Sequence, residues 1–186
     1  MPQKDSVPKV PKDFARRLQS LKAIVTDVDG VLTDGKIIYS ANGDELKEFH
    51  VRDGMIVGHL KSAGLVVGII SGRESAAVAR RGAELKLDFC HQGIEDKSWA
   101  IGRIMKHHGL KAKEVAFLGD DINDLPVFAE VGMRVAPADA PAYIRAQADV
   151  VTRARGGEGV LREFGDMWLE ATGRMEKLNK VKKKKD

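Results

Sequence analysis

Short apolar runs recur along the chain, separated by stretches in which apolar residues return at helical spacing. The runs are rich in β-branched residues, end at glycine or acidic residues, and have the length of buried strands. We predict strands at residues 21–26, 65–70, near 89, and at 115–118, 133–135 and 150–151. Strands that alternate with helices in this way indicate βαβ units. The predicted fold class is therefore α/β, with a Rossmann-like parallel sheet flanked by helices.

The segments between these runs predict helices, with glycine or proline at several of their ends. Asp53 is expected to cap the first of them, and Trp99 and Trp168 are expected to pack in the interior. The predicted helices cover residues 53–63, 74–85, 97–108, a short stretch after Pro126, 141–147 and 160–171.

A β-hairpin is predicted before the first of these helices. Two apolar segments, residues 37–39 and 46–51, flank Asn42-Gly43, a pair typical of tight hairpin turns. Because this hairpin and one helix fill the interval between the first two strands of the sheet, no large additional domain fits there.

Composition and charge predict how the chain is organised and where the protein is located. The 186 residues carry a net charge of +4, and a lysine run near the end supplies much of it. We expect an N-terminal extension over residues 1–18, one domain over 19–173, and a solvated basic tail over 174–186. No run is long enough to span a membrane, no secretory signal is evident, and Cys90 stands alone. These features favour a cytoplasmic protein without a nucleic-acid or membrane partner.

Polar residues follow three of the predicted strands. Asp27-Val28-Asp29-Gly30 follows the first strand, Ser71-Gly72-Arg73 follows another, and Gly119-Asp120-Asp121 follows a third. Ligand sites of open α/β sheets lie at the carboxyl ends of the strands. We therefore expect these three segments to face one crevice.

The clustered carboxylates indicate phosphate chemistry that depends on a metal. Carboxylates held together raise each other's pKa and persist when a cation neutralises them, and a site made only of oxygen ligands favours Mg²⁺. Of Asp27 and Asp29, one can attack phosphorus, while the other protonates the leaving oxygen. Ser71 and Gly72 offer a hydroxyl and backbone N–H groups to phosphoryl oxygens, and Lys97 offers a positive charge.

These residues resemble the four motifs of the haloacid dehalogenase superfamily. The first motif is Asp27-Val-Asp-Gly-Val-Leu-Thr-Asp34, Ser71 and Lys97 stand for the second and third, and Gly119-Asp-Asp-Ile-Asn-Asp124 stands for the fourth. The resemblance implies that Asp27 is the nucleophile, that Asp29 is the general acid and base, and that Ser71 and Lys97 bind the phosphoryl group. It also implies that Mg²⁺ is held by Asp27, the Asp29 backbone carbonyl and Asp120, while Asp121 and Asp124 hold water ligands of the metal or orient Lys97.

A narrower resemblance, over residues 21–173, is to a capless subfamily that hydrolyses 3-deoxy-D-manno-octulosonate 8-phosphate. It rests on Phe49-His-Val-Arg-Asp-Gly54, Ile70-Ser-Gly-Arg73, Gln92-Gly93 and Gly156-Gly157, among other segments. The resemblance implies a homotetramer in which hairpins assemble at the centre and a neighbouring subunit covers each site. It also implies a step in lipopolysaccharide synthesis. Ser71 and Glu158 depart from the pattern, which often has threonine and arginine at these positions.

A sugar acid phosphate brings a carboxylate, which arginine binds in bidentate geometry. Arg52, Arg73 and Arg81 occupy positions that could serve. An acylneuraminate or related nonulosonate 9-phosphate is the alternative substrate, because close relatives that act on such compounds share the pair Asn123-Asp124. An alternative of another class is a non-catalytic phospho-acceptor or regulatory module, against which Asp29 argues, because a lasting phospho-aspartate needs no acid two residues on.

Overall fold

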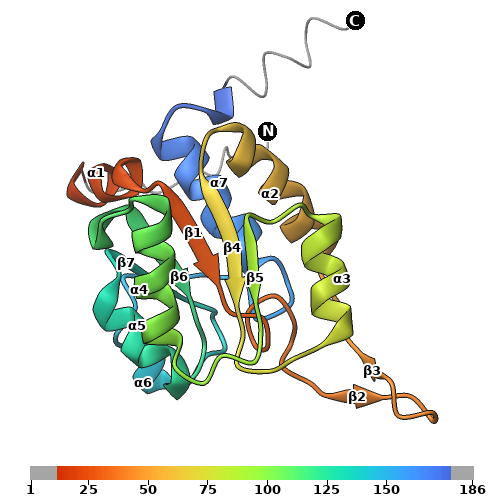
Figure 1. Cartoon of the computed structure of the whole chain (residues 1–186). Coiled ribbons are helices and arrows are strands. Elements are labelled where there is room, and N and C mark those ends of the chain that lie inside the picture. Colours follow the sequence, from red (N-terminus) through yellow and green to blue (C-terminus); the bar gives the residue numbers. More distant parts are fainter. Residues whose placement is uncertain (1–11, 177–186) are drawn as a thin grey trace, which may run out of the picture.

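A parallel sheet forms the centre of the protein, described here by a computed structural model over residues 12–176 (Figure 1). Six strands pair in the order β5-β4-β1-β6-β7-β8, and every pairing in this sheet is parallel. The predicted fold class is confirmed. The strands are β1 (Ala23–Thr26), β4 (Val66–Ile70), β5 (Phe89–His91), β6 (Val115–Leu118), β7 (Met133–Ala136) and β8 (Val150–Val151).

Two apolar layers sandwich this sheet, because its central strands are buried on both faces. In β1, Ile24 points into one layer, whereas Ala23 and Val25 point into the other. Parallel strands covered on both faces read as continuous apolar runs, which is why the sequence pattern located them. The helices are α1 (Lys12–Ser20), α2 (Val51–Ser62), α3 (Ala76–Glu84), α4 (Lys97–His108), α5 (Leu125–Glu130), α6 (Ala142–Arg145) and α7 (Val160–Ala171), and two short 3₁₀ helices are η1 (Ala112–Glu114) and η2 (Ile122–Asp124).

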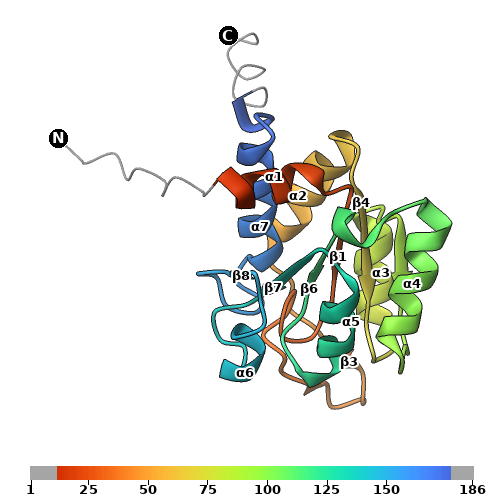
Figure 2. The same cartoon turned by 90° about the vertical axis from the view of Figure 1, so that its left-hand side faces the viewer.

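The helices divide between the two faces of the sheet. Side chains of α1, α2, α3 and α7 contribute to the layer that contains Ile24, and those of α4, α5 and α6 contribute to the other. Figure 2 shows α1 crossing α7 at one end of the molecule. The α1 side chain of Leu18 is fully buried there, so the helix that begins inside the predicted extension packs on the core.

Local capping sets the position of α4. The Asp96 side chain accepts a hydrogen bond from the backbone N–H of Trp99 at 2.8 Å, and Gly109 ends the helix with a φ of 63°. An N-cap carboxylate and a left-handed glycine are the usual signals for the start and the end of a helix. As a result α4 begins at Lys97, on the carboxyl side of the sheet.

The prediction that Asp53 caps α2 was wrong. His50 is the N-cap, its ring nitrogen accepting a hydrogen bond from the backbone N–H of Arg52, and Asp53 lies inside the first turn. The buried Asp53 carboxylate instead accepts a hydrogen bond from the backbone N–H of Arg162 at 2.7 Å, in the first turn of α7. Burial raises the pKa of Asp53 to about 6, against the effect of this hydrogen bond. Asp53 therefore joins α2 to α7.

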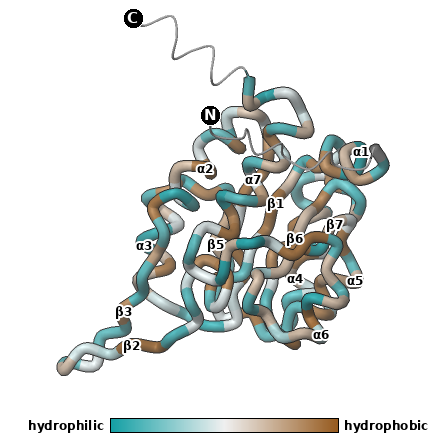
Figure 3. The backbone as a smooth tube through the Cα atoms, turned by 180° about the vertical axis from the view of Figure 1, so that it is seen from behind, coloured by the Kyte–Doolittle hydropathy of each residue, from teal (hydrophilic) through white to brown (hydrophobic). Residues whose placement is uncertain are grey.

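The predicted hairpin is present and projects from the body of the protein (Figure 1). It consists of β2 (Ile38–Tyr39) and β3 (Glu45–Leu46), paired antiparallel around the turn at Asn42-Gly43. The second strand is shorter than predicted, because the chain leaves the pairing after Leu46 and α2 already begins at Val51. Figure 3 shows hydrophobic residues on β2, outside the core.

One tryptophan follows the prediction and the other contradicts it. Trp168, on α7, is buried in the core, whereas Trp99 is 61% exposed. In α4 the face that packs on the sheet carries Ala100, Ile101 and Ile104, and Trp99 lies off this face. The Arg103 guanidinium instead lies 5.4 Å from the centre of the Trp99 ring.

Among the described residues, no helix combines the length and the apolar character needed to cross a bilayer.

Asp149 should contribute to stability in a pH-dependent way. Burial favours its neutral form, but hydrogen bonds from Arg134 and Arg17 outweigh burial and lower the pKa of Asp149 from 3.8 to about 2. A group whose pKa is lower in the folded state stabilises the fold fully above about pH 4 and loses this effect as the pH falls through about 2. We expect Asp149→Asn to lower the free energy of unfolding by about 1–2 kcal/mol at pH 7.

Urea unfolding of wild type and Asp149→Asn between pH 7 and pH 3 measures this effect. The difference between their free energies of unfolding should become smaller as the pH falls toward 3. Asp13→Asn is the control, since Asp13 pairs with Arg16 at 3.4 Å on the exposed side of α1 and should contribute little. If the difference between wild type and Asp149→Asn in the free energy of unfolding stays constant over the whole pH range, the lowered pKa of Asp149 is not its source.

Candidate active site

The predicted polar segments meet at the carboxyl edge of the sheet. β1 pairs with β4 on one side and with β6 on the other, so the ends of these three strands lie next to each other. Asp27 follows β1 directly, and its backbone N–H donates to the carbonyl of Leu118 at the end of β6, at 2.9 Å. Ser71 follows β4, and Asp120 lies one residue beyond Gly119 after β6.

Asp27 is nearly buried at this edge, where both of its oxygens have donors. Oδ1 accepts the backbone N–H of Val28 at 2.7 Å, and Oδ2 accepts the Lys97 ammonium at 2.5 Å. Burial, followed by the charge of Asp124, raises the pKa of Asp27 to about 6, although Lys97 acts in the opposite direction. The residue is thus a fixed carboxylate in contact with a cation.

Lys97 bridges two of the aspartates. Its Nζ also donates to Asp124 Oδ1 at 2.8 Å, and the side chain is 4% exposed. Asp124 Oδ2 accepts the backbone N–H groups of Asp120 and Asp121, at 2.9 and 3.3 Å. Burial alone would lower the pKa of Lys97, but the charges of Asp27 and Asp124 outweigh burial and raise it. Lys97 therefore keeps its charge, and Asp124 fixes its direction.

Asp120 lacks such a cation. Its Oδ1 is buried and has no hydrogen-bond partner within the described part of the chain. Burial and then the charges of Asp124, Asp27 and Asp121 raise the pKa of Asp120 to about 8. A buried carboxylate surrounded by like charges is costly unless a cation compensates it.

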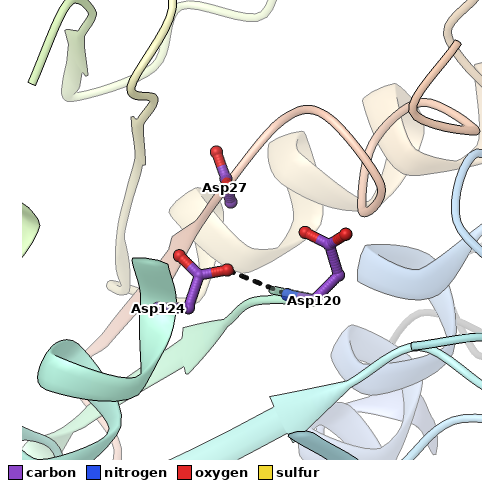
Figure 4. Close-up of side chains that lie close together, drawn as sticks. All are labelled: Asp27, Asp120 and Asp124. Carbon is purple, nitrogen blue, oxygen red and sulfur yellow. Dashed lines mark hydrogen bonds between the residues drawn. The ribbon is translucent and has the colours of Figure 1, made fainter. Parts of the chain in front are cut away.

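A magnesium ion fits this place. Figure 4 shows the carboxylates of Asp27, Asp120 and Asp124 converging, and one oxygen of each lies within 4.8 Å of the others. All three donors are hard oxygens, the ligand type that Mg²⁺ prefers. Asp27 and Asp120 would hold the ion. Asp124 already accepts three hydrogen bonds, so it is better placed to support the site than to occupy it.

Glycines let the loop after β1 approach Asp120. Gly30 has a φ of +84°, and a Cβ built there would lie 1.9 Å from Asp120 Oδ2. On its other side, a Cβ at Gly156 would lie 2.2 Å from the Gly30 carbonyl oxygen. The loop is therefore held between Asp120 and the glycine segment that leads into α7, with no space for a side chain at either position.

Ser71 and its neighbours form the second side of the crevice. Ser71 is buried, its backbone N–H donates to the His91 carbonyl at 2.9 Å, and its Oγ accepts the backbone N–H of Arg73 at 3.3 Å. The Ser71 hydroxyl keeps a proton to donate. Gly72 is exposed at the turn between them.

The Asp29 side chain contacts cations from other segments of the chain. Its Oδ1 accepts a hydrogen bond from the ammonium of Lys47, and the Nε of Arg73 lies 3.7 Å from its Oδ2. The sequence-based predictions missed Lys47. The signal was available, because Glu45 and Lys47 flank exposed Leu46 with strand-like alternation, which turns both charges to the same side.

The remaining predicted residues lie further out. Asp121 is exposed, and its Oδ1 accepts the backbone N–H of Ile122 at 2.7 Å and the Tyr143 hydroxyl at 3.4 Å. Arg52 is exposed on the first turn of α2. Arg81 lies 3.4 Å from Glu84 and stacks over the Phe49 ring.

A surface groove connects Lys47 with α3. It has a volume of about 340 Å³ and is lined by Lys47, Phe49, Ala77, Arg80 and Arg81, among others. The walls thus combine Arg80 and Arg81, both paired with Glu84, with apolar side chains, next to the cation that holds Asp29. Such a lining suits a polar ligand with a carbon skeleton.

Known proteins resemble this chain over most of its length. The model of the haloacid dehalogenase-like hydrolases matches residues 83–164. The 3-deoxy-D-manno-octulosonate 8-phosphate phosphatase of Haemophilus influenzae is 43% identical over 159 residues, which cover 86% of this chain and 88% of that protein. The enzyme of the same name from Escherichia coli is 38% identical over 90% of this chain and 89% of its own length.

A solved structure agrees with these matches. The phosphatase of the same name from Moraxella catarrhalis, crystallised with magnesium, phosphate and the sugar acid, superposes with a TM-score of 0.87 at 35% identity. The match covers 90% of this chain and 96% of that one. Sequence and fold thus point to one group of proteins.

Gly30→Ala should weaken the binding of Mg²⁺ while the fold remains. The added methyl group collides with the Asp120 carboxylate, so we expect Mg²⁺ affinity to fall by at least about tenfold, as measured by titration calorimetry. Gly64→Ala is the matched control, since Gly64 has a φ of +90° but no atom within 4 Å of its added Cβ. The control should lose stability through backbone strain and keep its affinity, and equal losses of affinity in both variants would contradict the role of Gly30.

Proposed function

The chain belongs to the 3-deoxy-D-manno-octulosonate 8-phosphate phosphatase family of the haloacid dehalogenase-like hydrolases, and from this membership we propose that it hydrolyses 3-deoxy-D-manno-octulosonate 8-phosphate to the sugar acid and phosphate. The observation that carries the proposal is the contact of Asp27 with Lys97, next to the uncompensated Asp120 carboxylate. A nucleophile, a fixed cation and a place for a metal thereby meet at one sheet edge.

The proposed reaction has two steps. Asp27 attacks phosphorus while the bond from phosphorus to the sugar oxygen breaks, and the electron pair of that bond stays on the sugar oxygen, which takes a proton from Asp29. In the second step Asp29 takes a proton from water as the water oxygen attacks phosphorus. The bond between Asp27 and phosphorus then breaks, and its electron pair returns to the Asp27 carboxylate.

The surrounding residues bind and neutralise the phosphoryl group. Lys97 places a positive charge beside Asp27, while Ser71 and Gly72 offer donors to the phosphoryl oxygens. Bound Mg²⁺ supplies the further positive charge that lets an anionic carboxylate approach an anionic phosphate. We assign the ion to Asp27, the Asp29 backbone carbonyl and Asp120, with Asp121 and Asp124 behind it.

The sugar acid would lie on the Asp29 side of the phosphate. Arg73, next to Asp29, is the best placed of the three arginines to meet the substrate carboxylate. Arg81 lines the groove that starts at Lys47, and Arg52 follows Val51, another residue of its lining. A nonulosonate 9-phosphate is the second candidate substrate, favoured by the pair Asn123-Asp124.

We further propose a homotetramer built around the hairpins. Ile37, Ile38, Tyr39 and Leu46 are all about half exposed, although they are large and apolar. A two-stranded hairpin is marginally stable alone, so an apolar hairpin that projects from the body favours burial against other copies. A neighbouring subunit would then cover the site, and Glu158, in the glycine segment before α7, is positioned for such contact.

We place the protein in the cytoplasm, because phosphorylated sugars do not cross membranes and are consumed where they are made. There the reaction would supply the sugar acid for lipopolysaccharide synthesis. The domain of residues 19–173 would carry the activity. The basic tail over 174–186 is expected to be solvated, and its residues from 177 onward lie outside the described part of the chain.

Phosphate release provides the test of function. With Mg²⁺ the protein should hydrolyse the eight-carbon sugar acid phosphate with a higher kcat/KM than the nine-carbon compounds, and EDTA should abolish turnover. Asp27→Asn should lower kcat by at least about 10⁴-fold with the fold intact, because the amide is a poor nucleophile. If Mg²⁺ supports no turnover of any of these esters, or if Asp27→Asn remains active, the proposal fails.

The hairpin proposal is tested by the mass of the particle in solution. Ile38→Ser with Tyr39→Ser should convert tetramers to smaller species in light-scattering measurements, since both changes remove apolar area from the proposed interface. Val151→Ser is the control, because Val151 is similarly exposed but lies on β8. A wild-type monomer, or a double variant that stays tetrameric, would exclude this assembly.

A further inference from the structure

Lys47 is the cation nearest to Asp29, and its side chain is almost completely enclosed. The Lys47 side chain is 1% exposed, its Nζ contacts Asp29 Oδ1, and it lies 3.5 Å from Glu45 Oε1. Enclosed lysines are rare unless they are paired. This ammonium therefore has a fixed position, and the Asp29 oxygen that it contacts has one too.

The two oxygens of Asp29 are in different situations. Oδ1 faces Lys47 and, at 3.5 Å, the hydroxyl of Thr33. Oδ2 has only the more distant Arg73 Nε, at 3.7 Å, among the ion pairs of the described residues. The Arg73 side chain is 44% exposed and donates to Glu45 at 2.8 Å. One oxygen is thus engaged, and the other remains available for a proton.

The backbone around Lys47 explains how it reaches this position. Glu45 and Lys47 point toward the site, whereas Leu46 between them is 52% exposed on the opposite side. Alternation along this extended segment therefore turns Glu45 and Lys47 toward Asp29 and Leu46 toward the outside. The segment that leaves the projecting hairpin thus carries the Lys47 side chain into the crevice.

We propose that Lys47 is a positioning residue for the reaction: it holds Asp29 through Oδ1 so that Oδ2 delivers the proton to the leaving oxygen. The inference rests on the proposed function insofar as Asp29 is the general acid. A carboxylate that rotates freely would present the proton in the right direction for only part of the time. A carboxylate held by Lys47 would keep the productive orientation.

The alternative role for Lys47 is direct binding of the substrate carboxylate, since the residue also lines the groove beside α3. The enclosed position argues against that role, because the ammonium already has Asp29 and Glu45 as anionic partners. A substrate carboxylate would have to displace one of them. The two roles predict that the loss of activity in a Lys47 variant depends on the substrate in different ways, so a comparison of substrates can separate them.

The test compares Lys47→Met with wild type on three phosphate esters. These are the sugar acid phosphate, glycerol phosphate as an alkyl ester without a carboxylate, and p-nitrophenyl phosphate, whose leaving group needs little protonation. The parameter is kcat/KM, because it reports only the steps up to departure of the leaving group. We expect a loss of about 10²-fold on both alkyl esters and of about tenfold or less on the aryl ester.

Lys36→Met is the matched control. Lys36 precedes the same hairpin and pairs with Asp34 at 2.6 Å, but its side chain is 76% exposed. Its kcat/KM should stay close to wild type on all three esters. Lys47→Arg keeps a charged donor and should recover part of the loss on the alkyl esters, which also keeps the test valid if Lys47→Met does not fold.

Each other outcome overturns the proposal in a recognisable way. Equal losses on all three esters, together with a lower melting temperature, would mean a structural role. A loss confined to the sugar acid phosphate, with a raised KM, would mean that Lys47 binds the substrate. If wild type hydrolyses the two simple esters but not the sugar acid phosphate, the proposed substrate fails, while the comparison of alkyl with aryl ester still decides the role of Lys47.

Discussion

Repulsion between buried carboxylates is the constraint on which the candidate site depends. Asp27, Asp120 and Asp124 lie at the ends of β1 and β6 with oxygens within 4.8 Å of one another. Lys97 compensates Asp27 and Asp124, and the backbone N–H groups around η2 compensate Asp124 further. Asp120 has no such partner in the described chain, although its Oδ1 is buried, so a bound cation would compensate its negative charge. An electrostatic imbalance thus favours a metal ion at this place.

The fold tolerates this imbalance because strong backbone pairing holds the aspartates. Asp27 is connected to β6 through a hydrogen bond to Leu118, and a central strand cannot shift without breaking its pairing on both sides. Gly30 and Gly156 then bring the loop after β1 so close to Asp120 that no side chain fits between. Rigidity of this kind fixes the reacting groups before a ligand arrives.

Local signals made most of the fold predictable from the sequence. The bounds of α4, α7, β6 and β8 agree with the prediction, because apolar periodicity and helix-ending glycines act within a few residues. The strand-end rule likewise brought Asp27, Ser71 and Asp120 to one edge. The errors concern partners distant in sequence: Asp53 contacts α7, 109 residues away, and Lys47 reaches Asp29 across the first loop. The prediction for Trp99 failed for another reason, because an aromatic residue on a helix need not face the core.

The alternation of Glu45, Leu46 and Lys47 also limits how the chain can change in length. A single residue inserted or deleted in the Asn42-Gly43 turn would shift the pairing of β3 by one position and exchange its two faces. Leu46 would then turn toward the charged crevice, and Lys47 would turn toward the outside. Substitutions in this turn should be tolerated far more readily than odd-numbered changes of its length. The number of residues in the hairpin therefore helps to determine which side chains face the active site.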